Sequence, residues 1–158
     1  MGIEATVKKT EPMVAAYISK KGPYSQISES FGQLYGWIGE RSYIPAGPPF
    51  GVYYNAPGQV AESELQWELG SPLAGDVEPM GPGDQGLGVR RIEALEVAAL
   101  THKGPYDTVG GTWGQLGAWI MENGYEIAGP GWEVYLSDPG STPPEELLTE
   151  IRFPVKKK

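Results

Sequence analysis

The chain has 158 residues, 40% of them hydrophobic and 11% aromatic, which is enough apolar material for one domain with a buried core. It has no cysteine and a single histidine, which excludes disulfides, thiolate chemistry and zinc sites built from several imidazoles, and we expect no metal or cofactor. Its net charge of -8 disfavours direct binding to nucleic acid, and because no apolar run is long enough to span a membrane, we expect a cytoplasmic protein.

The first half of the chain is typical of a strand, a helix and two further strands. Residues 13–20 (MVAAYISK) are short, apolar and compatible with a strand, which Gly22 and Pro23 then end. Apolar residues recur at helical spacing at Ile27, Phe31, Leu34, Tyr35 and Ile38, which predicts a helix with one buried face. Two strands are predicted after it, at 50–55 (FGVYYN) and 64–70 (ELQWELG).

The second half repeats this pattern at an offset of 82 residues. Residues 7–73 align with 89–155 without a gap, and residues 74–88 form a linker rich in glycine and proline. Ser25 and Asp107 precede the two helices and are predicted to be their N-caps. The second set of strands is predicted at 95–102, 132–137 and 146–153, and its helix carries the apolar stripe of Val109, Trp113, Leu116 and Ile120.

The order of elements predicts an α+β fold. Each module is β-α-β-β, and two copies are too few for a solenoid, so we expect a tandem duplication around a pseudo-twofold axis. The strands should form a mostly antiparallel sheet with the two helices on one face. One domain is therefore expected over residues 1–158, with module one at 7–73 and module two at 89–155.

The candidate site is predicted where the two copies differ. Glu133 and Tyr135 share a strand face because they are two residues apart, and the repeat aligns them with Gly51 and Tyr53. The glycine should open volume, and the carboxylate beside it should attract a flat organic cation or act as a general acid or base. The alternative is that Glu133 is a solvated strand residue.

Other residues have a structural alternative that the sequence favours or leaves open. Trp37, Trp113 and Trp119 lie on or beside the helix stripes and are more typical of the core, whereas Tyr17 and Trp67 could face either way. Glu68 and Glu150 are interpreted as structural acids, with Arg152 as the ion partner of Glu150. His102 is interpreted as a surface basic residue, and the GPGDQG at 81–86 does not have the context of a dinucleotide site.

The order and spacing of the motifs resemble the GyrI-like family, also described as the effector-binding domain of AraC-type regulators. These motifs are Gly-Pro-Tyr after the first strand, a tryptophan near the helix end, Ala-Gly-Pro, a Val-Tyr strand and the closing TEIRFPV, from Val7 to Val155. The resemblance implies two modules with a central ligand cleft between them. It also implies that the family's central acidic residue corresponds to Glu133 and its pocket aromatics to Tyr53, Tyr135 and their neighbours.

We therefore expect a freestanding multidrug-binding protein for lipophilic, aromatic, preferably cationic compounds, with a role in drug resistance by sequestration. The resemblance leaves two alternatives open: a hydrolase that opens cyclopropane-bearing DNA-alkylating agents with Glu133 as the catalytic residue, and a module that inhibits DNA gyrase. No helix-turn-helix precedes the first module, so direct transcription control is not expected, and two fused modules favour a monomer. The candidate ligand-binding residues are Glu133, Tyr135, Tyr53, Gly51, Trp67, Tyr17, Trp113 and Tyr106.

Overall fold

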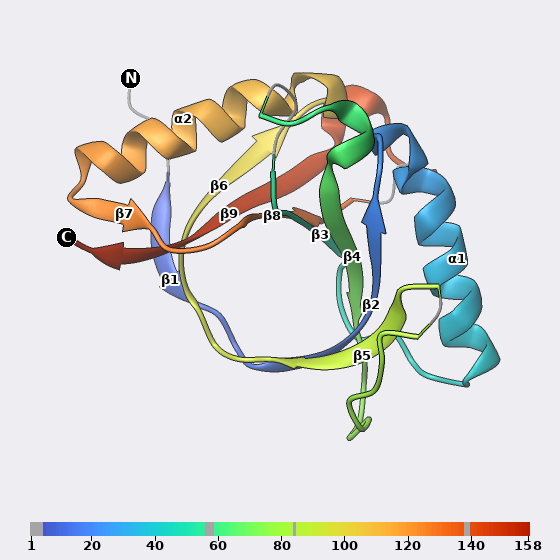
Figure 1. The fold of residues 1–158 in the computed structure, drawn as a ribbon. Coiled ribbons are helices and arrows are strands. Elements are labelled where there is room, and N and C mark those ends of the chain that lie inside the picture. The colour runs from blue at the N-terminus through green and yellow to red at the C-terminus, as the bar shows by residue number, and fades with distance from the viewer. Residues whose placement is uncertain (1–4, 56–58, 84, 138–139) are drawn as a thin grey trace. The chain divides into compact units, whose positions relative to one another are not determined.

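The computed structural model describes residues 5–55, 59–83, 85–137 and 140–158. This part of the chain contains nine strands and two α-helices, and the strands pair mostly in antiparallel fashion (Figure 1). The α+β class and the antiparallel pairing are thus as predicted. The chain forms two compact units, unit 1 from Met1–Glu11 with Ala94–Lys158 and unit 2 from Pro12–Glu93.

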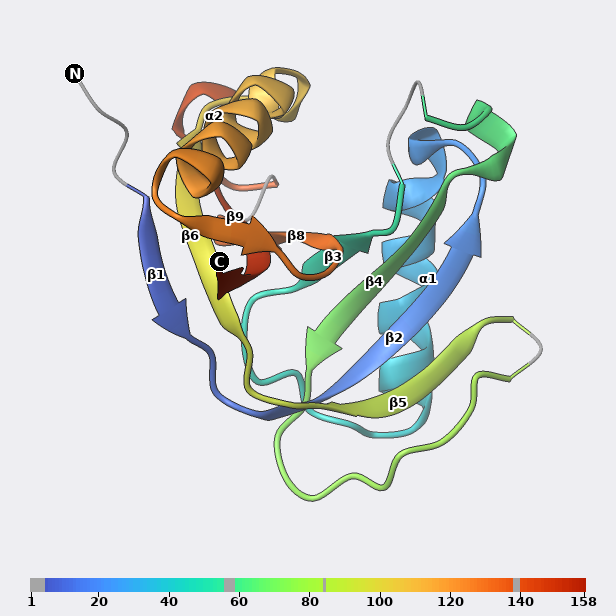
Figure 2. The ribbon, with the colours of Figure 1, turned by 60° about the vertical axis from the view of Figure 1, so that its left-hand side comes forward.

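Unit 2 is a four-stranded sheet with one helix on it. Its strands are ordered β3-β4-β2-β5 and each neighbouring pair is antiparallel. Helix α1 contacts β2 and β4, as Figure 2 shows. The elements are β2 (Met13–Lys21), the 3-10 turn η1 (Tyr24–Gln26), α1 (Ile27–Glu40), β3 (Phe50–Tyr53), η2 (Glu62–Glu64), β4 (Gln66–Pro72) and β5 (Leu87–Ile92).

Unit 1 has the same arrangement with one additional strand. Its sheet is ordered β1-β6-β9-β8, again antiparallel, and β7 pairs with the far end of β9. Helix α2 contacts β6, β7 and β9. The elements are β1 (Thr6–Lys9), β6 (Glu96–Lys103), η3 (Tyr106–Thr108), α2 (Val109–Glu122), β7 (Tyr125–Ile127), β8 (Gly131–Tyr135), η4 (Pro144–Glu146) and β9 (Leu148–Lys157).

The first strand of each half pairs with the other half of the chain. β1 lies within residues 7–73 for most of its length but pairs with β6, and β5 lies within 89–155 for most of its length but pairs with β2. The compact units therefore do not coincide with the contiguous segments 7–73 and 89–155. The helices occupy 27–40 and 109–122, which is an offset of 82 residues, but a common origin of the two halves stays a prediction.

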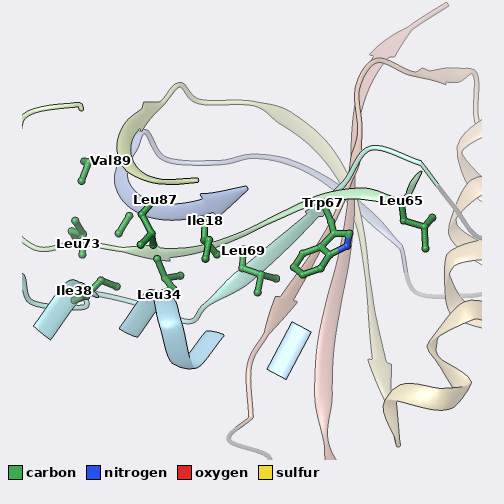
Figure 3. Close-up of a cluster of buried hydrophobic side chains, with 10 residues drawn as sticks. Ile18, Leu34, Ile38, Leu65, Trp67, Leu69, Leu73, Leu87 and Val89 are labelled. Atoms are coloured by element: carbon green, nitrogen blue, oxygen red, sulfur yellow. The ribbon is translucent and has the colours of Figure 1, made fainter. Parts of the chain in front are cut away.

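The core of unit 2 lies between its sheet and α1. Leu34 and Ile38 of the helix are buried in one cluster with Ile18 of β2 and with Trp67 and Leu69 of β4, and Figure 3 shows these side chains. The predicted helix stripe is confirmed, since Ile27, Phe31 and Tyr35 also contact this cluster. Removing such side chains from water is the main stabilising contribution, about 1.5 to 3 kcal/mol for each fully buried one.

The core of unit 1 is built in the same way. Leu116 and Ile120 of α2 are fully buried against Ala98 of β6 and Ile151 of β9. Neither helix begins as predicted: their N-cap residues are Gln26 and Thr108, and neither makes a side-chain capping bond. Each helix instead follows a 3-10 turn that begins at the tyrosine of Gly-Pro-Tyr. Among the described residues no helix is long and apolar enough to cross a membrane.

Candidate functional site

Glu133 and Tyr135 lie on the face of β8 that α2 covers. Their partners across the ladder are Ile151 and Thr149 of β9, and directly opposite residues of two paired strands share a face. Ile151 belongs to the core under α2, so the Glu133 side chain points from the sheet towards that helix. Strand alternation thus places a carboxylate at the edge of an apolar core.

Two neutral donors hold the Glu133 carboxylate. Trp113 on α2 donates from Nε1 to Oε2 at 2.6 Å, and the Tyr135 hydroxyl donates to Oε1 at 2.8 Å. In the described residues no lysine, arginine or histidine forms an ion pair with Glu133. Hydrogen bonds from an indole and a phenol fix the position of the carboxylate without neutralising its charge.

Further aromatic rings pack against the two donors of this carboxylate. The ring of Tyr106 meets that of Tyr135 edge to face, with centroids 5.8 Å apart, and Trp113 meets Phe153 in the same way at 5.1 Å. Trp113 also lies directly over Gly131, where an added Cβ would come within 2.1 Å of the indole ring. Gly131 therefore permits the close approach that brings the indole nitrogen to Glu133. Three predicted residues, Tyr106, Trp113 and Tyr135, are thus brought together with Glu133 within unit 1.

The equivalent position in unit 2 is filled by a tyrosine. An added Cβ at Gly51 would lie 2.6 Å from the Tyr53 hydroxyl oxygen, so the ring of Tyr53 lies over the glycine. The expectation that Gly51 opens volume is therefore wrong at this point, because the missing side chain makes room for Tyr53. Tyr24 meets Tyr53 edge to face at 5.4 Å, as Tyr106 meets Tyr135 in unit 1.

Trp67 and Tyr17 lie on opposite faces of the unit 2 sheet. Trp67 is 1% exposed in the core under α1 and donates from Nε1 to the Gly22 carbonyl at 3.0 Å, so it is a core residue here rather than an accessible ring. Tyr17 is also buried, but on the face away from α1, where the Arg90 guanidinium lies 3.9 Å from its ring centroid. The ligand-binding role of both residues stays a prediction.

Two further glutamates lie on the sheet faces away from the helices and are paired with cations. Glu150 accepts from Lys8 and Arg152, as predicted for Arg152. Burial alone raises the pKa of Glu150, but the hydrogen bonds and charges of Lys8 and Arg152 outweigh it and lower the pKa. Glu150 thus forms ion pairs within the fold, and the second glutamate does the same in unit 2.

In unit 2 the corresponding acid is Glu68. It accepts from Ser19 at 2.6 Å and Arg90 at 2.7 Å, and from the Tyr54 hydroxyl at 3.0 Å. Burial and the Glu68 charge raise the pKa of Tyr54, and the pKa of Arg90 is raised because Glu68 outweighs the effect of burial.

His102 is not a surface residue, contrary to the sequence interpretation. It is 8% exposed at the end of β6 and contacts Thr112 of α2, Pro105 and Thr108. Strand parity could have revealed this, because His102 shares a face with Ala98 and Leu100 of the core. Phe153 was also missed as a neighbour of the site, although it is two residues from Ile151 on the same strand face. No group of three or more metal-binding side chains occurs among the described residues.

Known proteins share this sequence pattern and fold. A family model described as the GyrI-like small molecule binding domain matches residues 4–156, whereas a search of curated proteins finds no relative. The C-terminal domain of EcmrR is 22% identical with a TM-score of 0.82, and the match covers 100% of both chains. EcmrR in its DNA complex is 19% identical with a TM-score of 0.84, over 98% of this chain but 58% of that one.

Two other solved structures have the same fold. A hydrolase from Listeria innocua is 14% identical with a TM-score of 0.70, over 98% of this chain and 93% of that one. SAV2435 bound to tetraphenylphosphonium is 15% identical with a TM-score of 0.62, over 98% of this chain and 94% of that one. At these identities the likeness establishes the fold alone.

Proposed function

The chain belongs to the GyrI-like small-molecule-binding family, and from this premise we propose that it binds lipophilic aromatic cations with Glu133 as the charged contact. One observation carries the proposal: the Glu133 carboxylate is held among aromatic rings by two neutral donors, with no cationic partner in the described part of the chain. Its negative charge is therefore available to a ligand.

The surroundings of Glu133 favour a cation with apolar groups. Coulomb attraction grows as the effective dielectric constant falls, so a half-buried carboxylate attracts a ligand cation more strongly than an exposed one. The rings of Tyr106, Tyr135 and Trp113 offer apolar area and negative π-faces for such a cation. Each Glu133 oxygen already accepts one hydrogen bond, which suits a delocalised or shielded charge better than an ammonium group that needs several acceptors.

The same arrangement supports binding rather than turnover. Glu133 accepts hydrogen bonds from Trp113 and Tyr135, and among the described residues no second carboxyl group and no histidine is hydrogen-bonded to it. Acid-base hydrolysis commonly uses a second positioned group of that kind. We propose that the protein protects by sequestering its ligand in a stoichiometric complex, whereas a cyclopropane-opening hydrolase would release a water adduct repeatedly.

Calorimetric titration with tetraphenylphosphonium tests the charge role of Glu133. This cation is bound by SAV2435, which shares the fold. Replacing Glu133 with glutamine keeps an acceptor but removes the charge, and we expect the affinity to fall about tenfold to a hundredfold, since each factor of ten is about 1.4 kcal/mol. The neutral compound triphenylphosphine oxide should bind wild type and Glu133→Gln alike.

Glu146→Gln is the matched control for this titration. It makes the same change in net charge at an exposed position of η4 in the same unit, so the affinity for tetraphenylphosphonium should stay at the wild-type value. Equal affinities of Glu133→Gln and Glu146→Gln would refute the charge role. Mass detection of a water adduct in excess over the protein, after incubation with a cyclopropane-bearing alkylating agent, would instead establish hydrolysis.

A further inference from the structure

His102 connects the end of β6 to the turn that carries Tyr106. The turn runs from Gly104 to Thr108, and the imidazole Nε2 of His102 contacts the Pro105 carbonyl at 3.2 Å and the Thr108 hydroxyl at 3.1 Å. These two contacts lie on either side of Tyr106 in the sequence. The other ring nitrogen, Nδ1, lies 2.6 Å from the Thr112 hydroxyl on α2. The side chain thus has one arm on the turn and one on the helix.

The partners define the roles of the two nitrogens. A carbonyl oxygen only accepts, so the contact with Pro105 requires a proton on Nε2 of His102. In the neutral imidazole Nδ1 is then the acceptor, and the hydroxyl of Thr112 donates to it. The Thr108 hydroxyl also donates to the Pro105 carbonyl at 2.9 Å, so these groups form a small hydrogen-bond network around the turn. With three partners at 8% exposure, His102 is held in one orientation.

The turn leads directly to the carboxylate. Tyr106 meets Tyr135 edge to face at 5.8 Å, and the hydroxyl of Tyr135 donates to Glu133 at 2.8 Å. A shift of the turn would therefore move the ring that supports Tyr135. The hydrogen bonds of His102 in the described part of the chain do not include Glu133, so its effect on the site would pass through these two tyrosines.

In unit 2 another residue holds the equivalent Gly-Pro-Tyr turn. There Trp67 donates from Nε1 to the carbonyl of Gly22, in the equivalent turn, at 3.0 Å. The position equivalent to Trp67 in unit 1 is Thr149, which is paired with His102 across β6 and β9. A threonine is too short to replace the indole, and the imidazole from the neighbouring strand supplies the donor instead. Both units thus hold the Gly-Pro-Tyr turn by a buried ring N–H.

We propose that His102 is a positioning residue that fixes Tyr106, and through it Tyr135, for ligand binding at Glu133. This inference rests on the proposed function of Glu133 as the charged contact. The position of Tyr106 should depend on Nε2 of the imidazole, because this nitrogen is hydrogen-bonded to the turn, whereas Nδ1 is hydrogen-bonded to the helix.

Two amide substitutions separate the arms. The polar atoms of an Asn side chain reach the position of Nδ1, so His102→Asn keeps the contact with Thr112 and loses the contacts of Nε2 with the turn. The Gln side chain reaches the position of Nε2, so His102→Gln keeps the turn contact and loses Thr112. We expect His102→Gln to bind tetraphenylphosphonium within about threefold of wild type and His102→Asn about tenfold more weakly, since a factor of ten is about 1.4 kcal/mol, which is within the range for loss of a hydrogen bond.

Thr112→Val provides a second test of the same division. It removes the partner of Nδ1 without touching the turn, and it should bind like His102→Gln. Thermal unfolding of both His102 variants is the control for stability, because each loses one arm and their midpoints should be similar. A purely structural role would weaken binding in parallel with stability and would not distinguish Asn from Gln.

Hydrogen exchange of the Thr108 amide gives a readout that needs no ligand. This amide donates to the Pro105 carbonyl at 3.2 Å, and we expect it to exchange faster in His102→Asn but not in His102→Gln. Equal affinities and equal exchange of the two variants would overturn the positioning role. If wild type does not bind tetraphenylphosphonium, the proposed function fails, and unchanged exchange in His102→Asn would separately overturn the hold of His102 on the turn.

Discussion

Three partly buried glutamates of the sheets, Glu68, Glu133 and Glu150, differ in what holds them. Glu68 and Glu150 accept from arginine or lysine, and their charges are compensated within the fold. Glu133 accepts from an indole and a phenol, which stabilise its position but carry no charge. Residue type and burial are similar, so it is the partner that distinguishes a structural acid from a candidate binding acid.

Thr149 lies on the same face of the unit 1 sheet as Glu133, but its polar group has no hydrogen-bond partner among the described residues. Its side chain is fully buried between His102 and Tyr135 in the ladder. A buried unpaired hydroxyl costs about 1 to 3 kcal/mol. We therefore expect Thr149→Val, which replaces it with a methyl group of similar shape, to leave the free energy of unfolding unchanged or raise it by about 1 kcal/mol.

Urea unfolding measures this effect, and Thr112→Val is the matched comparison. The Thr112 hydroxyl is bonded to His102, so its removal should lower the free energy of unfolding by about 1 kcal/mol. A Thr149→Val protein that is as destabilised as Thr112→Val would mean that the Thr149 hydroxyl does have a bonding partner in solution.

At the scale of elements, alternate residues of strand β9 place apolar side chains on one face of the sheet and charged side chains on the other. Ile151 and Phe153 face α2 and the candidate site, whereas Glu150 and Arg152 face the other side, where Lys8 of β1 joins them. The ion pairs therefore tie β1 to β9 across β6 without contacting the site. Their contribution to stability should depend on pH.

The sign of this dependence follows from the lowered pKa of Glu150. Because its folded-state pKa lies below the unfolded value near 4.5, the stabilisation is fully present above that value and is lost as the pH falls through the folded pKa. We expect Glu150→Gln to lose about 1 to 2 kcal/mol of unfolding free energy at about pH 7, and the difference from wild type to shrink towards about pH 3.

Chemical denaturation at several pH values would check the Glu150 prediction. Glu146→Gln, an exposed acid of the same unit, should follow wild type throughout. A difference for Glu150→Gln that is constant from neutral to acidic pH would show that the carboxylate charge is not what stabilises β1 on the sheet.

At the scale of the whole molecule, periodicity predicted the elements but not all of their partners. The helices were predicted from apolar spacing and the main strands from alternation, because these patterns report burial directly. β1, β5 and β7 were missed as strands: β1 and β7 are short, and β5 begins in a segment whose glycine and proline content indicated a linker. Glu133 is a candidate because the two halves differ there, and its role stays a prediction, whereas the prediction for His102 was wrong because its basic neighbours suggested exposure.

Pairing of β1 with β6 and of β5 with β2 has a consequence for how the chain can be divided. The contiguous segment that forms a compact unit, with strands β2 to β5 and helix α1, is Pro12–Glu93, whereas a cut at residue 82, beyond the first module, leaves β2 without β5. Loss of the edge strand β5 leaves unpaired the backbone N–H and C=O groups of β2 that pair with it. It also removes the apolar side chains of Leu87 and Val89, which cover the core.

We therefore expect the fragment 12–93 to fold with a cooperative thermal transition and the fragment 1–82, of equal length, to unfold at a lower temperature or without cooperativity. Leu87 and Val89 are both buried in the unit 2 core, and each would contribute about 1.5 to 3 kcal/mol, a large part of the stability of a domain this small. Circular dichroism of both fragments measures the outcome. Equal, cooperative transitions would mean that β1 can replace β5 beside β2, as contiguous modules would require.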